Sequence, residues 1–391
     1  MATEARGYDV LVIGAGAAGM MCAAVAGERG RRVALLDHGD LPGRKILISG
    51  GGRCNFTNLH CGPERFLSEN PHFAKSALAQ YTPKHFLELV KRYRILYHEK
   101  ALGQLFCDHS AQAILSMLLG ECERGGVQIT MRARDIRVER AGSGFRVECS
   151  QGTFEAAALV VATGGLSIPK LGATGFGYDV ARQFGLGVVE PRPALVPLTL
   201  AGAEAGWTAL AGVATRVVAQ AAGSKASFDE KLLVTHRGLS GPSVLQISSY
   251  WRAGQRLTVD FAPGERVLKA LHGARRDEAT LRQALRERLP ARLADFLVPQ
   301  IQPERWTNEA LEAAEKQLHE FPFHPSGTEG YAKAEVTAGG VDTRGLNSRT
   351  MEAREAPGLF FIGEAVDVTG QLGGFNFQWA WSSAVACGRA L

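Results

Sequence analysis

The chain lacks the cysteine pattern of a disulfide framework or a zinc site. Its 391 residues include seven cysteines, an odd number, and no two of them form a CxxC pair. Disulfide-rich folds use even sets of cysteines, and structural zinc sites use close cysteine and histidine pairs. We therefore expect no metal site and a reducing, cytoplasmic location.

Long apolar runs are also missing, with one exception at residues 10–27. These 18 residues carry no charge, and that length requires a membrane span or a signal peptide to be considered. The run is rich in glycine and alanine, follows the acidic Asp9 and contains a nucleotide-binding pattern. We therefore expect no membrane span, and a hydrophobic content of 46% is ample for packed cores.

The chain has no strong excess of either charge. Its 44 basic and 39 acidic side chains give a net charge of +5, which favours anionic ligands only weakly. Residues 264–320 place arginines opposite a leucine repeat, but acids are interspersed and aromatic residues are sparse. We therefore expect a solvated helical face there and no nucleic-acid partner.

The start of the chain predicts a strand, a glycine-rich turn, a helix and a second strand. An apolar run at 10–13 leads into GAGAAG, an alanine-rich stretch ends near Gly30, and a second apolar run covers 32–36. Asp37 follows directly. This order is that of a dinucleotide-binding βαβ unit.

A steric requirement explains why glycine stands at each of three positions of the turn. Gly14 allows a tight turn, Gly16 lets backbone approach a pyrophosphate, and Gly19 lets the helix pack closely on the strand. The helix N-terminus offers free N–H groups to phosphates. Asp37 can accept hydrogen bonds from the ribose hydroxyls of an adenosine.

Further glycine clusters suggest several loops that close on one extended ligand. GGG at 50–52 lies beside basic residues, and a short buried strand ends in Thr163-Gly164-Gly165. Near the C-terminus a strand ends in Gly363-Glu364, and a loop at 370–374 leads into a helix expected at 375–390. The positive end of the dipole of this second helix would stabilise a second negative charge, such as the charge on a reduced isoalloxazine ring.

The composition predicts an α/β protein with an interrupted first domain. We expect the first part of a Rossmann-like domain at 1–190 and its C-terminal part at 331–391. Residues 191–263 with 321–330 alternate like strands, and 264–320 follow a helical leucine repeat. The middle of the chain is thus expected to form an inserted β-rich domain with a helical insertion.

Four motifs resemble a known family. ISGGGRCNFTN, ATGGLSIPKLGATGFGYDVA, VTAGGVDTRGLNSRTME and GLFFIGEAVDVTGQLGGFNFQWAWSSAVACG are similar to the bacterial flavoproteins of the YhiN/BaiN type, also called aminoacetone-oxidase-family FAD-binding enzymes. The resemblance implies a glutathione-reductase-like FAD domain, interrupted by a β-barrel-like domain that carries a helical insertion. It also implies FAD as the cofactor.

The resemblance assigns site residues to three parts of FAD. The ADP half would be held by Gly14, Ala15, Gly16, Ala17, Ala18, Gly19 and Asp37. The pyrophosphate and ribityl region would be lined by Arg44, Lys45, Ser49, Gly50, Gly51, Gly52, Arg53, Cys54, Asn55, Thr163 and Gly164. The flavin would be covered by Gly363, Glu364, Asp367, Gly373, Gly374, Phe375 and Asn376. The family usually has Glu at the position of Asp37, and the Asp side chain is one methylene shorter than that Glu.

The leading functional hypothesis is an FAD-dependent oxidoreductase that transfers a hydride between a small organic substrate and flavin N5. A second GxGxxG of proper context is missing, so O2 or a transiently docked NAD(P)H would be the redox partner. The alternatives are an RNA-associated flavoprotein and a non-catalytic flavin-binding protein. Cys54 is interpreted as packed rather than redox-active. The sequence identifies no catalytic acid or base, no substrate and no oligomeric state; Tyr331, Lys333 and His236 are conceivable acid–base groups.

Overall fold

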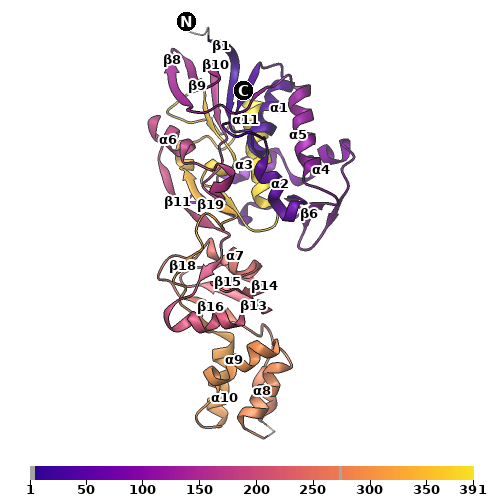
Figure 1. Ribbon diagram of the computed structural model, residues 1–391, viewed down its shortest axis with the longest axis vertical. Helices are drawn as coiled ribbons and strands as arrows, with labels where there is room; N and C mark the ends of the chain where they lie inside the picture. The colour runs from indigo at the N-terminus through magenta and orange to yellow at the C-terminus, as the bar shows by residue number, and fades with distance from the viewer. Residues whose placement is uncertain (1–4, 273–274) are drawn as a thin grey trace. The chain divides into compact units, whose positions relative to one another are not determined.

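The computed structural model describes residues 5–272 and 275–391. It divides into two compact units, one formed by 1–192 with 336–391 and the other by 193–335 (Figure 1). The first unit is therefore assembled from both ends of the chain. Each unit has its own hydrophobic core.

The first unit is built on a twisted, mostly parallel sheet. Its strand order is β7-β2-β1-β10-β9-β8, and β20 also pairs with β10. The pairs β7/β2, β2/β1, β1/β10 and β10/β20 are parallel, whereas β9 and β8 add an antiparallel edge. The bounds are β1 Arg6–Ile13, β2 Val33–Leu36, β7 Gln128–Thr130, β8 Arg137–Ala141, β9 Gly144–Cys149, β10 Gly152–Val161 and β20 Leu359–Phe361. The strands predicted at 10–13 and 32–36 are confirmed by β1 and β2, and the short strand predicted before Thr163 is the end of β10, which is 10 residues long.

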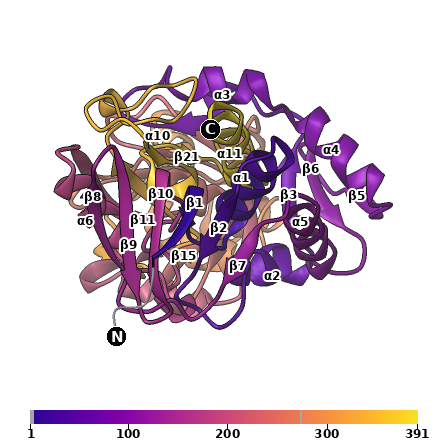
Figure 2. The same ribbon diagram turned by 90° about the horizontal axis from the view of Figure 1, so that it is seen from above.

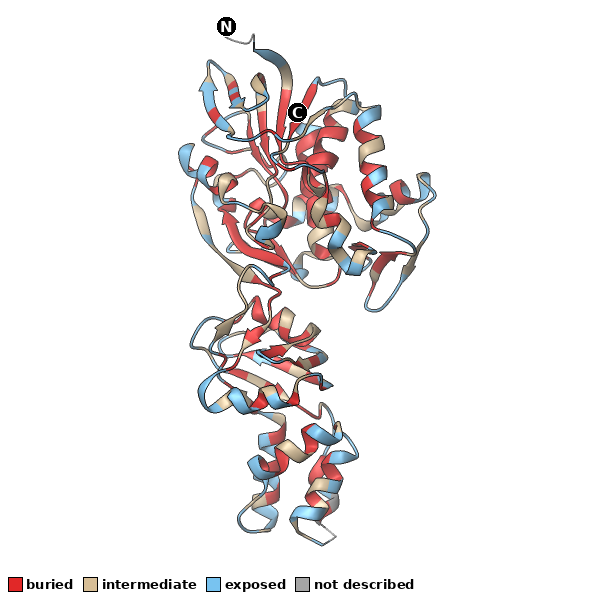
Figure 3. Cartoon of the chain, in the orientation of Figure 1, coloured by how far each residue is buried: buried red, intermediate tan, exposed pale blue. Residues whose placement is uncertain are grey.

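Three helices lie together beside this sheet (Figure 2). They are α1 (Ala17–Glu28), α5 (Gln112–Arg124) and α11 (Phe375–Ala390). Most residues of α1 and α11 are buried (Figure 3). Helices that are apolar on all sides are interior helices, which explains why the uncharged run at 10–27 folds into the core.

A small lobe of the first unit follows the glycine-rich segment at 50–52. It contains a three-stranded sheet in the order β3-β6-β5 and the helices α3 and α4. Helix α4 begins with a Thr82–His85 capping box and has Pro83 in its first turn. The bounds are β3 Asn55–Asn58, α3 Ala74–Gln80, α4 Pro83–Arg92, β5 Tyr97–Glu99 and β6 Gln104–Cys107.

Short elements connect these parts of the first unit. They are α2 Arg44–Ile48, η1 Ser49–Gly52, η2 Pro63–Arg65, β4 Phe66–Leu67, η3 Pro169–Leu171, α6 Phe176–Gln183, β11 Val188–Ala194, β19 Val336–Val341, η6 Thr343–Gly345, η7 Gly363–Ala365 and β21 Thr369–Gly370. Strand β11 pairs with β19 close to the boundary between the units, and β21 pairs with β4.

The second unit combines an antiparallel sheet with a group of helices. The strand order is β17-β16-β13-β14-β15-β12-β18, and helices and sheet share one core that includes the predicted leucine repeat. The tripeptide Ser240-Gly241-Pro242 ends β15 and starts the helix α7. The bounds are β12 Leu198–Thr199, η4 Gly202–Leu210, β13 Ala214–Ala221, β14 Ser227–Val234, β15 Gly238–Ser240, α7 Pro242–Ser248, β16 Leu257–Asp260, η5 Val267–His272, α8 Glu278–Arg286, α9 Ala291–Ile301, α10 Asn308–His319, β17 Phe321–Phe323 and β18 Gly327–Thr328.

Membrane-spanning helices and metal-binding clusters are both absent from the described residues. Across 5–272 and 275–391, every helix is too short or too polar to cross a membrane. In the same ranges, no group of three or more His, Cys, Asp or Glu side chains is arranged to hold a metal ion.

Candidate functional site

The candidate site lies where the central parallel strands of the first unit end. The strand registers place Ile13 beside both Leu36 and Val161, and Val161 beside Phe361. Because these strands are parallel, the residues that follow them meet at one edge of the sheet. Open α/β sheets bind ligands at such an edge. The segments brought together are 14–19, 37–39, 163–165 and 363–364.

The three glycines of the first turn occupy three different environments. A Cβ on Gly14 would lie 2.4 Å from the Ala162 carbonyl oxygen, and a Cβ on Gly19 would lie 1.8 Å from the Gly14 carbonyl oxygen. A Cβ on Gly16 would meet nothing within 4 Å. Gly14 and Gly19 are therefore needed by the fold itself, whereas the open space at Gly16 is available to a ligand.

The N-terminus of α1 fits a pyrophosphate. Its N-cap residue is Gly16, no side chain caps the helix, and the first turn contains no acid. Free N–H groups and the positive end of the helix dipole therefore point toward the open space at Gly16. Thr163 adds a buried hydroxyl that has no hydrogen-bond partner among the described residues, and a Cβ on the adjacent Gly164 would meet nothing within 4 Å. These features match the diphosphate part of FAD.

Asp37 is tied to the glycine turn. One carboxylate oxygen accepts from the Ala15 N–H at 2.7 Å and the other from the Gly39 N–H at 2.7 Å. Each oxygen can accept a further hydrogen bond, so contact with a ribose stays a prediction. A Cβ on Gly39 would lie 2.5 Å from the guanidinium of Arg44, which places this arginine beside Asp37.

The loop at 50–52 is held in a conformation that favours glycine. Gly50, Gly51 and Gly52 have φ angles of 55°, 67° and 83°, a region that other residues rarely adopt. The Ser49 hydroxyl donates to the Ile46 carbonyl oxygen at 2.7 Å, and Arg53 is exposed. Cys54 is fully buried, and burial raises the pKa of its thiol to about 12. The interpretation of Cys54 as a packed residue agrees with this burial.

Lys45 belongs to a polar network that the sequence did not predict. Its ammonium donates to the Glu364 carboxylate at 2.6 Å and to the Ser167 hydroxyl at 2.6 Å. The other Glu364 oxygen accepts from the Ser167 hydroxyl at 3.0 Å and from the Thr337 N–H at 2.9 Å. Lys45, expected to direct its charge toward phosphate, is thus paired with a carboxylate 319 residues away. The sequence signal for Ser167 and Thr337 is that they belong to the motifs ATGGLS and VTAGG.

Helix α11 fixes the C-terminal glycine loops. The Gly363 N–H donates to the Ser383 hydroxyl at 3.0 Å, and the Trp379 indole donates to the Gly363 carbonyl oxygen at 2.9 Å. The Asn376 amide makes hydrogen bonds with both the N–H (2.8 Å) and the carbonyl oxygen (2.9 Å) of Gly370. The helix therefore positions the backbone of both loops.

Strand β6 brings two residues to the site that sequence reasoning missed. A Cβ on Gly373 would lie 2.9 Å from the Gln104 side chain, and a Cβ on Gly50 would lie 2.9 Å from the Phe106 ring. In the amide orientation that satisfies its neighbours, Asn55 accepts from the Gly374 N–H at 3.3 Å. The glycine loops at 50–52 and 373–374 therefore both lie against β6.

The remaining expected site residues have structural partners. The buried Asp367 carboxylate accepts from the Glu69 N–H at 2.8 Å and from the Ser68 hydroxyl at 3.3 Å, and burial raises its pKa. Phe375 is buried against Phe66. Contact of Asp367 and Phe375 with a flavin stays a prediction. Tyr331, Lys333 and His236 lie in the second unit.

Comparisons with known proteins show the family of the chain. A family model described as "HI0933-like protein Rossmann domain" matches residues 8–390. The chain belongs to this family. Its fold is therefore that of FAD-dependent oxidoreductases, as the sequence resemblance predicted.

Three relatives match over nearly the whole chain. The ribosomal RNA dihydrouridine synthase of Escherichia coli is 50% identical, with 98% of each chain covered. The ribosomal RNA dihydrouridine synthase of Haemophilus influenzae is 46% identical, with 97% of this chain and 98% of the relative covered. The 3-dehydro-bile acid Δ4,6-reductase of Clostridium scindens is 31% identical, with the same coverage of 97% and 98%.

Among solved structures, the 3-ketosteroid Δ1-dehydrogenase of Sterolibacterium denitrificans matches with a TM-score of 0.52. It is 12% identical, and the match covers 98% of this chain and 99% of the dehydrogenase. At this identity the likeness concerns the fold alone.

Proposed function

We propose that the protein is a flavin-dependent reductase that converts uridine in ribosomal RNA to dihydrouridine. The observation that carries the proposal is the identity of 50% and 46% with two ribosomal RNA dihydrouridine synthases, over 98% and 97% of this chain. The proposal adopts the RNA-associated flavoprotein that the sequence left as an alternative. It sets aside the expectation that nucleic acid is not a partner.

The names of the relatives point to one kind of chemistry. Dihydrouridine differs from uridine by a saturated C5–C6 bond, and this bond in uracil is conjugated to a carbonyl group. A Δ4,6-reductase of a 3-oxo steroid likewise saturates carbon–carbon bonds conjugated to a carbonyl group. When bound, the flavin would supply the hydride, and a proton completes the reduction.

The residues of this chain would bind and orient the cofactor. The N–H groups at Gly16 and the start of α1 would hold the pyrophosphate, and Asp37 would hold the ribose. The Lys45–Glu364 pair joins α2 to η7, so it would fix the backbone on either side of the cofactor. NAD(P)H is proposed as the source of reducing equivalents.

The test uses an Escherichia coli strain that lacks its own ribosomal RNA dihydrouridine synthase. Expression of the chain should restore dihydrouridine in purified ribosomal RNA, measured by mass spectrometry of nucleosides. The purified yellow protein should also form dihydrouridine anaerobically in that RNA with NADH or NADPH. A Gly16→Asp variant is the control, because a carboxylate in the open space would repel a pyrophosphate.

The proposal fails if protein loaded with FAD produces no dihydrouridine in any ribosomal RNA, in cells or in vitro. A second candidate is the reduction of a small enone, supported by the 31% identity with the bile-acid reductase. Oxidation of the reduced flavin by a panel of enones, without any reaction with RNA, would favour this candidate.

A further inference from the structure

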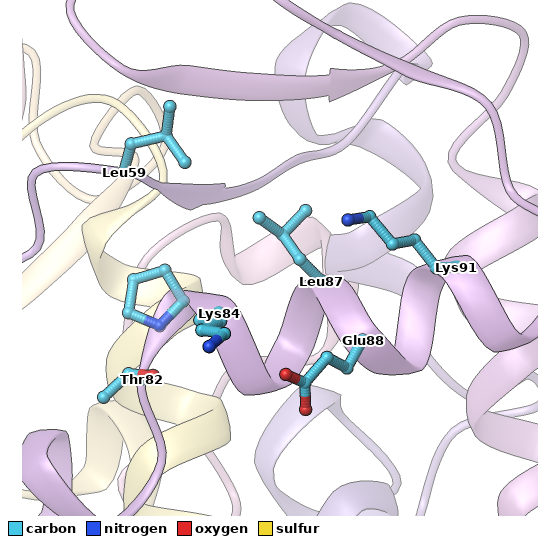
Figure 4. Close-up of a pocket in the computed structure, with 7 residues that line it drawn as sticks. Leu59, Thr82, Lys84, Leu87, Glu88 and Lys91 are labelled. Carbon is cyan, nitrogen blue, oxygen red and sulfur yellow. The ribbon is translucent and has the colours of Figure 1, made fainter.

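The solvent-facing side of α4 combines lysines with apolar surface. Lys84, Leu87, Glu88 and Lys91 follow helical spacing, while Phe86, Leu89 and Val90 on the other side are buried. With Leu59, Thr82 and Pro83, the solvent-facing residues line a shallow hollow of about 430 Å³ (Figure 4). The hollow is lined by residues of the small lobe, not by the glycine loops of the cofactor site.

The hairpin between β5 and β6 extends this surface. The Leu59 N–H donates to the Gly103 carbonyl oxygen at 2.8 Å, and the Asn58 amide donates to the Leu102 carbonyl oxygen at 3.1 Å. The tip of the hairpin therefore lies beside the hollow. Leu59 is 45% exposed and Leu102 is 65% exposed, and the Lys100 ammonium lies 5.4 Å from the centre of the Phe106 ring. We call Leu59, Lys84, Leu87, Lys91, Lys100 and Leu102 the hairpin surface.

The lysines of the hairpin surface form no ion pair among the described residues. Lys84, Lys91 and Lys100 are all exposed, and Glu88 is the acid that lies one helical turn from Lys84 and Lys91. The arginines on the helices of the second unit differ, because Arg282 and Arg286 both pair with Asp295. Charge that has no protein partner is available to phosphates, so the hairpin surface is better suited to nucleic acid than the arginine-rich helices are.

Strand β6 links the hairpin surface to the candidate cofactor site. Lys100 and Leu102 lie in the turn that enters β6, and Gln104 and Phe106 in the same strand contact Gly373 and Gly50. A nucleic-acid strand on the hairpin surface would therefore lie next to the loops that are expected to hold the flavin. Exposed leucines can contact unstacked bases, which are accessible in single-stranded RNA but not in a duplex.

We propose that the hairpin surface binds a single-stranded segment of the ribosomal RNA substrate and presents the target uridine to the cofactor site. This inference rests on the proposed function and adds the location of the RNA and the groups that hold it. The three lysines would contact phosphates, and the leucines would contact bases. Glu88, which lines the hollow, would weaken the binding of the nearby phosphates.

The test compares FAD-loaded full-length proteins. The triple variant Lys84→Ala/Lys91→Ala/Lys100→Ala should bind a single-stranded ribosomal RNA fragment at least about tenfold more weakly at low salt. Loss of three phosphate contacts should also reduce the slope of log K against log salt by about 2, at roughly 0.7 per contact. The matched control is Arg31→Ala/Arg134→Ala/Arg137→Ala, which removes three exposed cations of the same unit and should change neither value. Glu88→Gln should tighten binding.

Three measurements keep the outcomes distinct. Flavin absorbance and melting temperature show whether a variant still folds and holds FAD, and the single lysine variants replace the triple variant if it does not. In the dihydrouridine assay the triple variant should raise KM for RNA more than it lowers kcat. If wild-type protein forms dihydrouridine and the triple variant binds RNA equally well, the inference is wrong and the proposed function stands. If wild-type protein neither binds RNA nor forms dihydrouridine, both fail.

Discussion

At the scale of single residues, two glycines of one turn should respond differently to the same change. Gly16 has an ordinary φ of −85° and open space around it, so Gly16→Ala should fold normally but bind FAD at least about tenfold more weakly, a loss of about 1.4 kcal/mol. In Gly19→Ala the new methyl group would overlap the Gly14 carbonyl oxygen. Such overpacking costs about 1–3 kcal/mol of folding stability.

The measurements for this pair are thermal unfolding without cofactor and titration with FAD at the flavin absorbance band. Equal FAD affinity in Gly16→Ala and wild type would contradict the placement of the pyrophosphate at this turn. A Gly7→Ala variant is the control, because a Cβ on Gly7 also meets nothing within 4 Å and Gly7 lies in β1, away from the turn.

The residue scale also shows what the sequence could predict. The roles of Gly14, Gly16 and Gly19 follow from local steric requirements. The spacing of the glycines in the sequence reveals those requirements directly. The Lys45–Glu364 pair joins residues 319 positions apart, and no local pattern records such a partner. Gln104 and Phe106 lie in a strand without glycine or charge, so nothing in the sequence indicated their contact with the glycine loops.

At the scale of elements, His319 joins α10 to β16 in the second unit. Burial disfavours its charged form, but hydrogen bonds with Asp260 at 2.7 Å and Glu315 at 3.1 Å outweigh burial and raise the pKa of His319 above its ordinary 6.5. Because the folded pKa is the higher one, the stabilisation is fully present below about pH 6.5 and is lost as pH rises through the folded value.

We therefore expect wild-type protein to lose stability between pH 6 and pH 8 more steeply than His319→Gln. The measurement is the urea midpoint of the second unit at several pH values. A His72→Gln variant serves as the control, because His72 is exposed and lies in the first unit. Parallel pH profiles for wild type and His319→Gln would show that the two carboxylates do not stabilise the imidazolium.

At the scale of the whole molecule, the sequence predicts that the first domain is interrupted after residue 190, and the compact units divide after Arg192. The strand-like alternation that starts at residue 191 indicated this boundary. The sequence did not indicate that the inserted strands and helices share one core. In that core Trp207 of η4 packs on four phenylalanines, Phe261, Phe296, Phe321 and Phe323. Those contacts depend on the tertiary fold and have no sequence period.

The division into two cores predicts that FAD stabilises the two units unequally. Every residue expected to bind FAD lies in the first unit, and a ligand that binds only the native form stabilises it by about 2.7 kcal/mol at a hundred times its Kd. Hydrogen exchange with and without FAD should therefore show slower exchange in the core strands β1 and β10, and little change in β13 and β14. Gly16→Asp should abolish the difference. Equal protection of both sheets would contradict this prediction and would mean that the two units unfold together.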